Sequence, residues 1–238
     1  MDIRTKGLVL AAGLWLATGM DGIDAASPAA GNALARLKAG NARFVAHPEE
    51  ALPVDAGKRA AVAKGQEPFA AVLSCADAQV PPEVIFHAGL GDLFVVRTAG
   101  HATDKAVLAS LEYSVDRLHV PLMVVMGHDT CDAVKSALEP AAGHGTGPNL
   151  DYLFGQLKPA TAAAASKPEV ERMRAAVLAN VEESLNDLLA GSAVLRDHGK
   201  EGHVAFVGAY YEAASGKTYF SEPVGPSPAE PHATGGHQ

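Results

Sequence analysis

The sequence predicts an α/β fold with a mostly parallel central sheet flanked by helices. First, short apolar runs alternate with helical patterns along the chain. Second, several of these runs contain β-branched stretches such as FVV and MVV, which suit strands buried on both faces of a parallel sheet. Third, 238 residues with 48% hydrophobic and 19% charged content suit one sizeable globular domain. We expect this domain at residues 31–222.

Residues 1–26 have the features of an export signal. Arg4 and Lys6 precede an apolar run at residues 8–20, and small residues follow it. This run is too short to span about 30 Å of hydrocarbon comfortably. We therefore expect a signal peptide, export to the periplasm and no membrane anchor in the mature protein. The alternative is a disordered or helical N-terminal extension.

The strands are expected in the following order. Residues 31–47 have a helical rhythm that Gly40-Asn41 interrupts, and a loop then runs to Pro68. Apolar runs predict strands at residues 69–74, 93–98, 121–126 and 204–210. A last strand at 217–220 completes a hairpin through Ser215-Gly216.

Helices are expected between these strands. Thr103 is the predicted N-cap of a helix whose apolar face comprises Val107, Leu108, Leu111, Val115 and Leu118. A second helix follows His128, and a shorter one lies around residues 150–157. A long helix begins at Pro168 and repeats apolar residues every three or four positions. Residues 223–238 contain few apolar residues and are expected to form a disordered tail.

Composition and motifs exclude several classes of function. The net charge of −8 argues against non-specific nucleic-acid binding, which needs a basic surface. The Gly-rich stretches at residues 89–91 and 99–101 do not fit a phosphate-binding motif. Ser74 lacks the elbow that exposes the nucleophile of a serine hydrolase.

Two cysteines and one histidine follow the expected strands. Cys75 comes directly after one strand, His128 follows another after a single glycine, and Cys131 lies three residues further on. Ligands of open parallel sheets bind at the carboxyl ends of strands, and the first turn of a helix would place His128 and Cys131 on one side. Two thiolates and one imidazole suit a tetrahedral Zn²⁺ with one open position. A disulfide between the two cysteines would use the same sulfur atoms and stays open as an alternative.

Six segments resemble the β-class carbonic anhydrases and occur in that family's order. They cover roughly residues 31–221 and read RLKAGNARF, VLSCADAQVPPEVIF, GLGDLFVVRTAG, SLEYSVDRLHVPLMVVMGHDTCDAVKSAL, NVEESL and HVAFVGAYY. The resemblance implies that Cys75, His128 and Cys131 hold Zn²⁺, with water or Asp77 in the fourth position. It also implies reversible hydration of CO2 to bicarbonate and a proton through zinc-bound hydroxide, in a homodimer or a higher homo-oligomer.

The first motif departs from the family's Cys-Ser-Asp-Ser-Arg. Residues 75–79 read CADAQ, so Gln79 stands where the family has the arginine that pairs with the aspartate. A neutral amide pairs more weakly than a guanidinium, and we expect Asp77 to tend toward the metal. Asp77 and Gln79 are thus the candidate catalytic residues. Arg97 does not replace the missing arginine of the first motif, because the family already has an arginine at the place of Arg97. Asp132, which follows Cys131, adds a negative charge where the family has glycine.

Two further histidines are candidates for proton transfer. His87 and His101 stand where the family often has Asp and Asn, and either can serve as a proton shuttle because a histidine titrates near neutral pH. The alternative is that both are partly exposed surface histidines.

Besides carbonic anhydrase activity, the sequence leaves open hydrolysis of carbonyl sulfide or carbon disulfide on the same fold. It also leaves open a zinc-binding pseudoenzyme with Asp77 locked on the metal.

Overall fold

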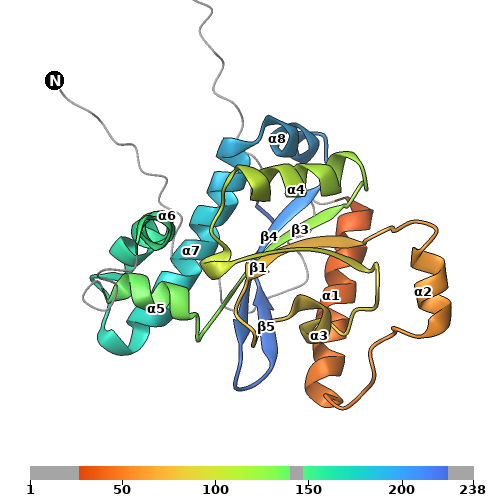
Figure 1. Cartoon of the computed structure of the whole chain (residues 1–238), viewed down its shortest axis with the longest axis horizontal. Helices are drawn as coiled ribbons and strands as arrows, with labels where there is room; N and C mark the ends of the chain where they lie inside the picture. Colours follow the sequence, from red (N-terminus) through yellow and green to blue (C-terminus); the bar gives the residue numbers. More distant parts are fainter. Residues whose placement is uncertain (1–26, 140–146, 225–238) are drawn as a thin grey trace, which may run out of the picture.

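A five-stranded, mostly parallel sheet forms the centre of the molecule (Figure 1). The computed structural model describes residues 27–139 and 147–224, so the expected export signal lies outside the described residues. The strand order is β2-β1-β3-β4-β5, and only β5 is antiparallel to its neighbour. The strands are β1 at Ala70–Cys75, β2 at Leu93–Thr98, β3 at Leu122–His128, β4 at Ala205–Glu212 and β5 at Lys217–Phe220. The predicted fold class and hairpin are confirmed.

Helices pack around this sheet (Figure 1). In chain order they are α1 at Pro28–Ala46, α2 at Ala56–Val62, α3 at Pro82–Ile85, the 3₁₀ turn η1 at Ala99–His101, α4 at Lys105–Asp116, α5 at Asp132–Leu138, α6 at Pro148–Ala164, α7 at Glu169–Gly191 and α8 at Ala193–Lys200. Within the two described ranges, no helix has the length and apolar content needed to cross a bilayer.

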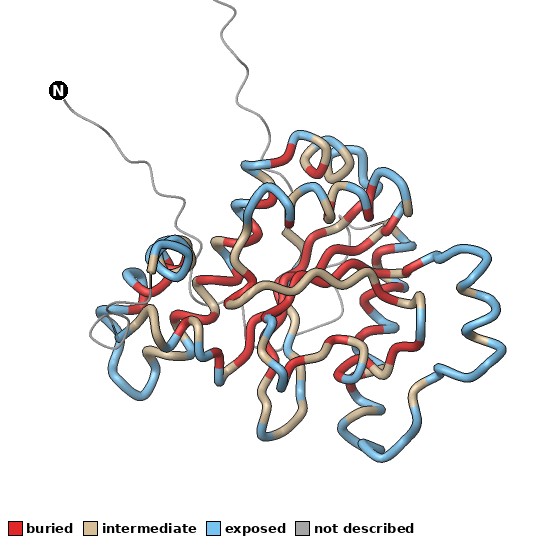
Figure 2. Tube along the Cα trace, in the orientation of Figure 1, coloured by how far each residue is buried: buried red, intermediate tan, exposed pale blue. Residues whose placement is uncertain are grey.

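The alternation of side chains along each strand builds one apolar core on each face of the sheet. In β3, Val124 and Met126 join the core that contains α1 and α3, whereas Met123 and Val125 join the core that contains α4 and α8. Strands β1, β3 and β4 are accordingly buried along nearly their whole length (Figure 2), whereas β2 is mostly half-buried. Burial on both faces explains why these strands appear in the sequence as continuous apolar runs.

Helix α1 continues through Gly40-Asn41, so the expected interruption is wrong. A Cβ atom at Gly40 would lie 1.9 Å from the carbonyl oxygen of Phe86, which means that glycine is needed for close packing here. The Asn41 amide donates to the carbonyl oxygens of Ile85 and Gly216, at 3.2 and 2.8 Å. Both residues therefore join α1 to distant parts of the chain rather than ending the helix.

Other expectations differ in detail. Asp104, not Thr103, is the N-cap of α4, and its carboxylate accepts from two backbone N–H groups of the first turn. Helix α6 is longer than expected, and the sequence reading missed α2, α3 and α8, each of which has eight residues or fewer. Of the expected tail, residues 225–238 lie outside the described part, and Val224 forms a β-bridge with Phe206.

Candidate metal centre

Cys75, His128 and Cys131 converge at the carboxyl edge of the sheet. Cys75 ends β1 and His128 ends the neighbouring strand β3, while Cys131 is the N-cap residue of α5. The expectation that His128 and Cys131 share the first turn of a helix is wrong, because His128 still pairs with Tyr211 in the sheet. The three residues nevertheless meet, since the intervening loop turns back over the strand end.

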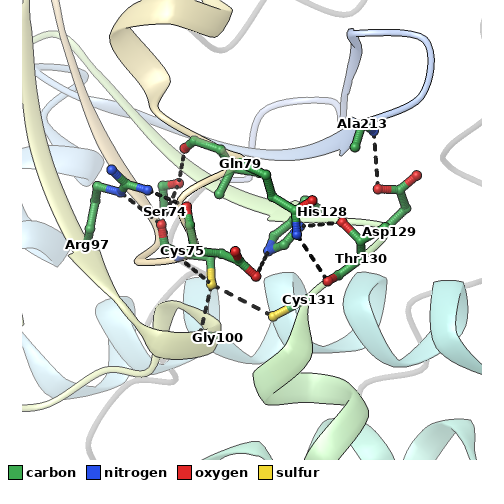
Figure 3. A network of polar contacts seen from close by, with 12 residues as sticks. Ser74, Cys75, Gln79, Arg97, Gly100, His128, Asp129, Thr130, Cys131 and Ala213 are labelled. Atoms are coloured by element: carbon green, nitrogen blue, oxygen red, sulfur yellow. Dashed lines mark hydrogen bonds and ion pairs between the residues drawn. The ribbon is translucent and has the colours of Figure 1, made fainter.

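The loop between His128 and Cys131 is anchored to the end of β4, the strand that flanks β3 on the side away from β1. The N–H of Asp129 donates to the carbonyl oxygen of Tyr211 at 3.1 Å. Oδ1 of Asp129 accepts from the N–H of Ala213 at 3.1 Å (Figure 3). These contacts hold the chain between His128 and Cys131 against the end of β4. The position of Cys131 is therefore set by long-range contacts as well as by its spacing from His128.

The three side chains offer a compact and buried donor set. One ligand atom from each lies within 4.8 Å of the others, and each residue is at most 2% exposed. The two Sγ atoms lie 3.8 Å apart, far beyond the about 2.0 Å of a disulfide bond, and both thiols are free. The structure therefore presents two thiols and an imidazole around one point, and not a disulfide.

An unsatisfied nitrogen supports a metal at this point. Nε2 of His128 is buried and has no hydrogen-bond partner among the described residues. Its other ring nitrogen, Nδ1, lies 3.4 Å from Oγ1 of Thr130. Buried polar atoms nearly always have a partner, and a metal ion at Nε2 with Nδ1 bonded to an outer group is a common arrangement. The residues present fit Zn²⁺, which prefers sulfur and nitrogen ligands in a tetrahedral set.

Hydrogen bonds favour the thiolate form of Cys75. The contact with Cys131 has the largest effect and, against the opposing effect of burial, holds the pKa of the Cys75 thiol well below its ordinary value. His128 and the N–H groups of Asp77 and Gly100 contribute in the same direction. The same contact, together with burial, raises the pKa of the Cys131 thiol. A cation bound between the two sulfurs would favour the thiolate form of both.

A turn after β2 positions one of these N–H donors. Gly100 has φ 61°, and its N–H points at Sγ of Cys75 from 3.3 Å (Figure 3). The side-chain amide of Asn180, on α7, donates to the carbonyl oxygen of Gly100 at 2.8 Å. The sequence reading missed both residues. The available signal was that Gly100 follows a strand adjacent to β1 and so lies at the same edge of the sheet.

His101 belongs to this buried turn. Its ring is 1% exposed, and Nδ1 lies 3.0 Å from Oγ of Ser184. Burial lowers the pKa of His101 to about 4. The expected surface position is wrong, and a buried ring that stays neutral at neutral pH is unsuited to carry protons to bulk solvent. His87 is half-buried and lines a surface cavity in which none of the three sulfur and imidazole ligands takes part.

The Asp77 carboxylate lies beside the donor set without the expected partner. Oδ2 of Asp77 is 3.9 Å from Nε2 of His128, and the side chain is 21% exposed. Gln79 is exposed and donates to the carbonyl oxygen of Thr130 at 3.4 Å (Figure 3). The expected contact between Gln79 and Asp77 is absent from the described part of the chain. Arg97 contacts only main-chain oxygens of this motif. Neither residue holds the carboxylate away from the metal position.

Comparisons with known proteins identify the family of the chain. A protein-family model described as "Carbonic anhydrase" matches residues 70–218. The chain is 39% identical over 195 residues to a Mycobacterium tuberculosis protein named "Carbonic anhydrase 2", in a match that covers 79% of this chain and 91% of the relative.

Solved structures of β-carbonic anhydrases share the fold of the chain. A Coccomyxa β-carbonic anhydrase in complex with acetazolamide matches with a TM-score of 0.64 and 25% identity, over 71% of this chain and 79% of that chain. A structure of two tetrameric β-carbonic anhydrases from Sordaria macrospora matches with a TM-score of 0.61 and 24% identity, over 80% of this chain and 95% of that chain.

Proposed function

Because the chain belongs to the β-class carbonic anhydrase family, we propose that it catalyses the reversible hydration of CO2 to bicarbonate and a proton, with Zn²⁺ as cofactor. The observation that carries this proposal is the buried set of two thiols and one imidazole with an unsatisfied Nε2. Zn²⁺, when bound, lowers the pKa of its water to about 7 and so supplies a nucleophile at neutral pH.

The protein's own contribution begins with the ligands. Sγ of Cys75, Nε2 of His128 and Sγ of Cys131 would hold the metal, and the two thiolates would balance its charge. The N–H groups of Gly100 and Asp77 donate to Sγ of Cys75 and orient it, at 3.3 and 3.4 Å. Such outer contacts fix the direction of a ligand and tune its affinity for the metal.

Asp77 has two roles open to its carboxylate. From beside His128, Oδ2 can accept a hydrogen bond from a reacting water, or it can bind the metal directly as a fourth ligand. Because neither Gln79 nor Arg97 contacts the carboxylate, we propose that direct binding is favoured in the resting protein. Activity then depends on how readily Asp77 leaves the metal.

Gln79 acts on the site through the loop that carries Cys131. Its amide donates to the carbonyl oxygen of Thr130, which lies between His128 and Cys131 in the chain. It thereby joins the first motif to the second. Gln79 is thus proposed as a positioning residue rather than as a group that touches the substrate.

Stopped-flow CO2 hydration on zinc-loaded protein tests the proposed function. We expect a rate clearly above the buffer background at neutral and mildly alkaline pH. Cys131→Ser should lose both zinc and activity, whereas His47→Ala, at an exposed position outside the site, should keep both. The proposal fails if protein with one zinc ion per chain hydrates CO2 no faster than buffer.

We also propose that the protein is a homodimer or a higher homo-oligomer. The tetrameric relatives from Sordaria macrospora support this assignment. Several large apolar side chains of the described part are exposed, among them Val45, Val54, Val84 and Leu90. Light scattering coupled to size-exclusion chromatography measures the mass in solution, and a monomeric mass at micromolar concentration contradicts the assignment.

Export to the periplasm remains our proposal for the location. It rests on the basic residues and apolar run within residues 1–26, which lie outside the described part. Fractionation of a Gram-negative host that expresses the full chain tests it, with N-terminal sequencing of the recovered protein. Recovery from the cytosol with the N-terminus intact contradicts the proposal.

A further inference from the structure

A second cluster of side chains that could bind a metal lies at the C-terminal end of α8 and in the turn before β4. His198, Glu201 and His203 each offer one ligand atom, and these atoms lie within 4.8 Å of one another. The cluster precedes the start of β4, whereas Cys75 and His128 lie at the carboxyl ends of parallel strands. It therefore lies toward the opposite edge of the sheet from the candidate metal centre. We propose that this cluster is a second binding site, for a divalent transition-metal ion such as Zn²⁺.

The backbone turn that carries these residues is held by hydrogen bonds. After α8 ends at Lys200, Gly202 adopts φ 74°, and the N–H of His203 donates to the carbonyl oxygen of His198 at 2.9 Å. This left-handed glycine reverses the chain, as at many helix C-termini. The rings of His198 and His203 consequently lie 5.5 Å apart between centroids. The two imidazoles are thus brought together before any ion binds.

His198 has the surroundings of a ligand on both of its ring nitrogens. Nδ1 is buried and has no hydrogen-bond partner in the described part of the chain. Nε2 faces Oδ1 of Asp116, at the end of α4, from 3.9 Å. Metal-bound histidines usually direct their second nitrogen at a carboxylate, which favours the proton on that nitrogen and leaves the other lone pair for the metal. A metal at Nδ1 would satisfy the one ring atom that the fold leaves without a partner.

Glu201 and His203 supply the other two ligand atoms, a carboxylate oxygen and an imidazole nitrogen. Nδ1 of His203 lies 3.1 Å from Oε2 of Glu201, and both side chains are about 60% exposed. Two imidazoles and one carboxylate are a ligand set that Zn²⁺ uses in proteins, with a further position open. His198 and His203 also line a surface cavity with His119, which gives an ion access from solvent. The exposure predicts a site that exchanges its metal readily, unlike the buried centre.

Counting bound zinc in equilibrium dialysis tests the proposal. Wild-type protein should bind one equivalent more per chain than the buried centre accounts for, and Cys131→Ser should keep this additional equivalent. His198→Ala and His203→Ala should each lose it while retaining the equivalent of the buried centre. Asp116→Asn should keep it with an affinity lowered by about 10- to 100-fold. CO2 hydration should be unchanged in His203→Ala, so the outcome does not depend on the proposed enzymatic function.

Two controls separate this site from other histidines. His47→Ala changes an exposed histidine outside the cluster and should retain the additional equivalent. The double variant His232→Ala/His237→Ala removes the two histidines near the C-terminus and should retain it as well. The proposal is overturned if wild type binds no additional zinc, if either His198→Ala or His203→Ala still binds it, or if the double variant loses it.

Discussion

Arg97 donates a hydrogen bond from Nη2 to the main-chain carbonyl oxygen of Asp77, at 2.5 Å, and does not pair with the Asp77 carboxylate. Its Nε donates to the carbonyl oxygen of Cys75 at 2.9 Å. The guanidinium thus shapes the backbone of the first motif, while the carboxylate faces Nε2 of His128. Arg97 therefore does not provide the charge that would hold this carboxylate off a metal.

Replacing Gln79 with arginine should supply that charge. A guanidinium at position 79 can form a charge-assisted pair with Asp77, which is roughly twice as strong as a neutral hydrogen bond. A gain of about 1.4 kcal/mol for the open state corresponds to a tenfold increase in kcat/KM. Stopped-flow CO2 hydration by zinc-loaded Gln79→Arg measures this gain. Gln79→Met, which adds no charge, is the matched control and should show no increase. Equal rates for Gln79→Arg and wild type would mean that Asp77 does not limit activity.

Removing the Asn180 amide should weaken zinc binding. Asn180 donates to the carbonyl oxygen of Gly100, whose N–H donates to Sγ of Cys75. Asn180→Ala frees this turn, and loss of an outer contact of this kind typically costs about 10- to 100-fold in metal affinity. Competition with a chromophoric chelator measures the affinity. Ser184→Ala, which alters a contact of the neighbouring His101 ring, should have a smaller effect. An unchanged zinc affinity in Asn180→Ala would contradict the role of the turn.

Replacing His101 should make stability less sensitive to acid. Burial keeps the pKa of His101 at about 4 in the folded protein, whereas the ordinary value is about 6.5. Between these values the unfolded chain binds more protons, so stability falls as the pH falls through this window. The loss amounts to about 3 kcal/mol when the pH has fallen to about 4.

The His101→Asn variant should lack this dependence on pH. Urea unfolding across the same pH window, on metal-free samples of both proteins, gives the free energy of unfolding at each pH. We expect a slope shallower by about one proton in the variant. Removing the metal beforehand ensures that its release at low pH does not contribute. Parallel curves for the two proteins would contradict the buried, neutral state of His101.

Two glycine-to-alanine variants should change stability in opposite directions. A Cβ at Gly40 meets the backbone oxygen of Phe86, so Gly40→Ala forces α1 and α3 apart and should cost about 1–3 kcal/mol or more. Gly155 lies inside α6, and beyond the helix's own adjacent backbone no atom lies within 4 Å of the place that an added methyl group would take. Gly155→Ala should therefore stabilise by about 0.5–1 kcal/mol. Denaturant midpoints measure both changes. Equal effects at the two positions would show that packing of α1 on α3 is looser than the structure has it.

Local patterns in the sequence determined the sheet and the identity of the candidate ligands in the buried cluster. Apolar runs set β1, β3 and β4, because strands buried on both faces need apolar residues at nearly every position. Cys75 and His128 could be predicted as candidate ligands because each stands where such a run ends. Membership of a family was readable from the order of six segments.

Only the tertiary structure decided which residues surround the candidate ligands, how deeply they are buried and which partners they contact. Asn41 continues α1 because its partners, Ile85 and Gly216, lie far away in the chain. His101 is buried by α7, and Gln79 contacts Thr130 rather than Asp77. The cluster of His198 and His203 depends on a left-handed turn at Gly202 and on Asp116 from another helix. A sequence pattern reports periodicity and local capping, whereas burial and partner choice depend on which distant segments the fold brings together.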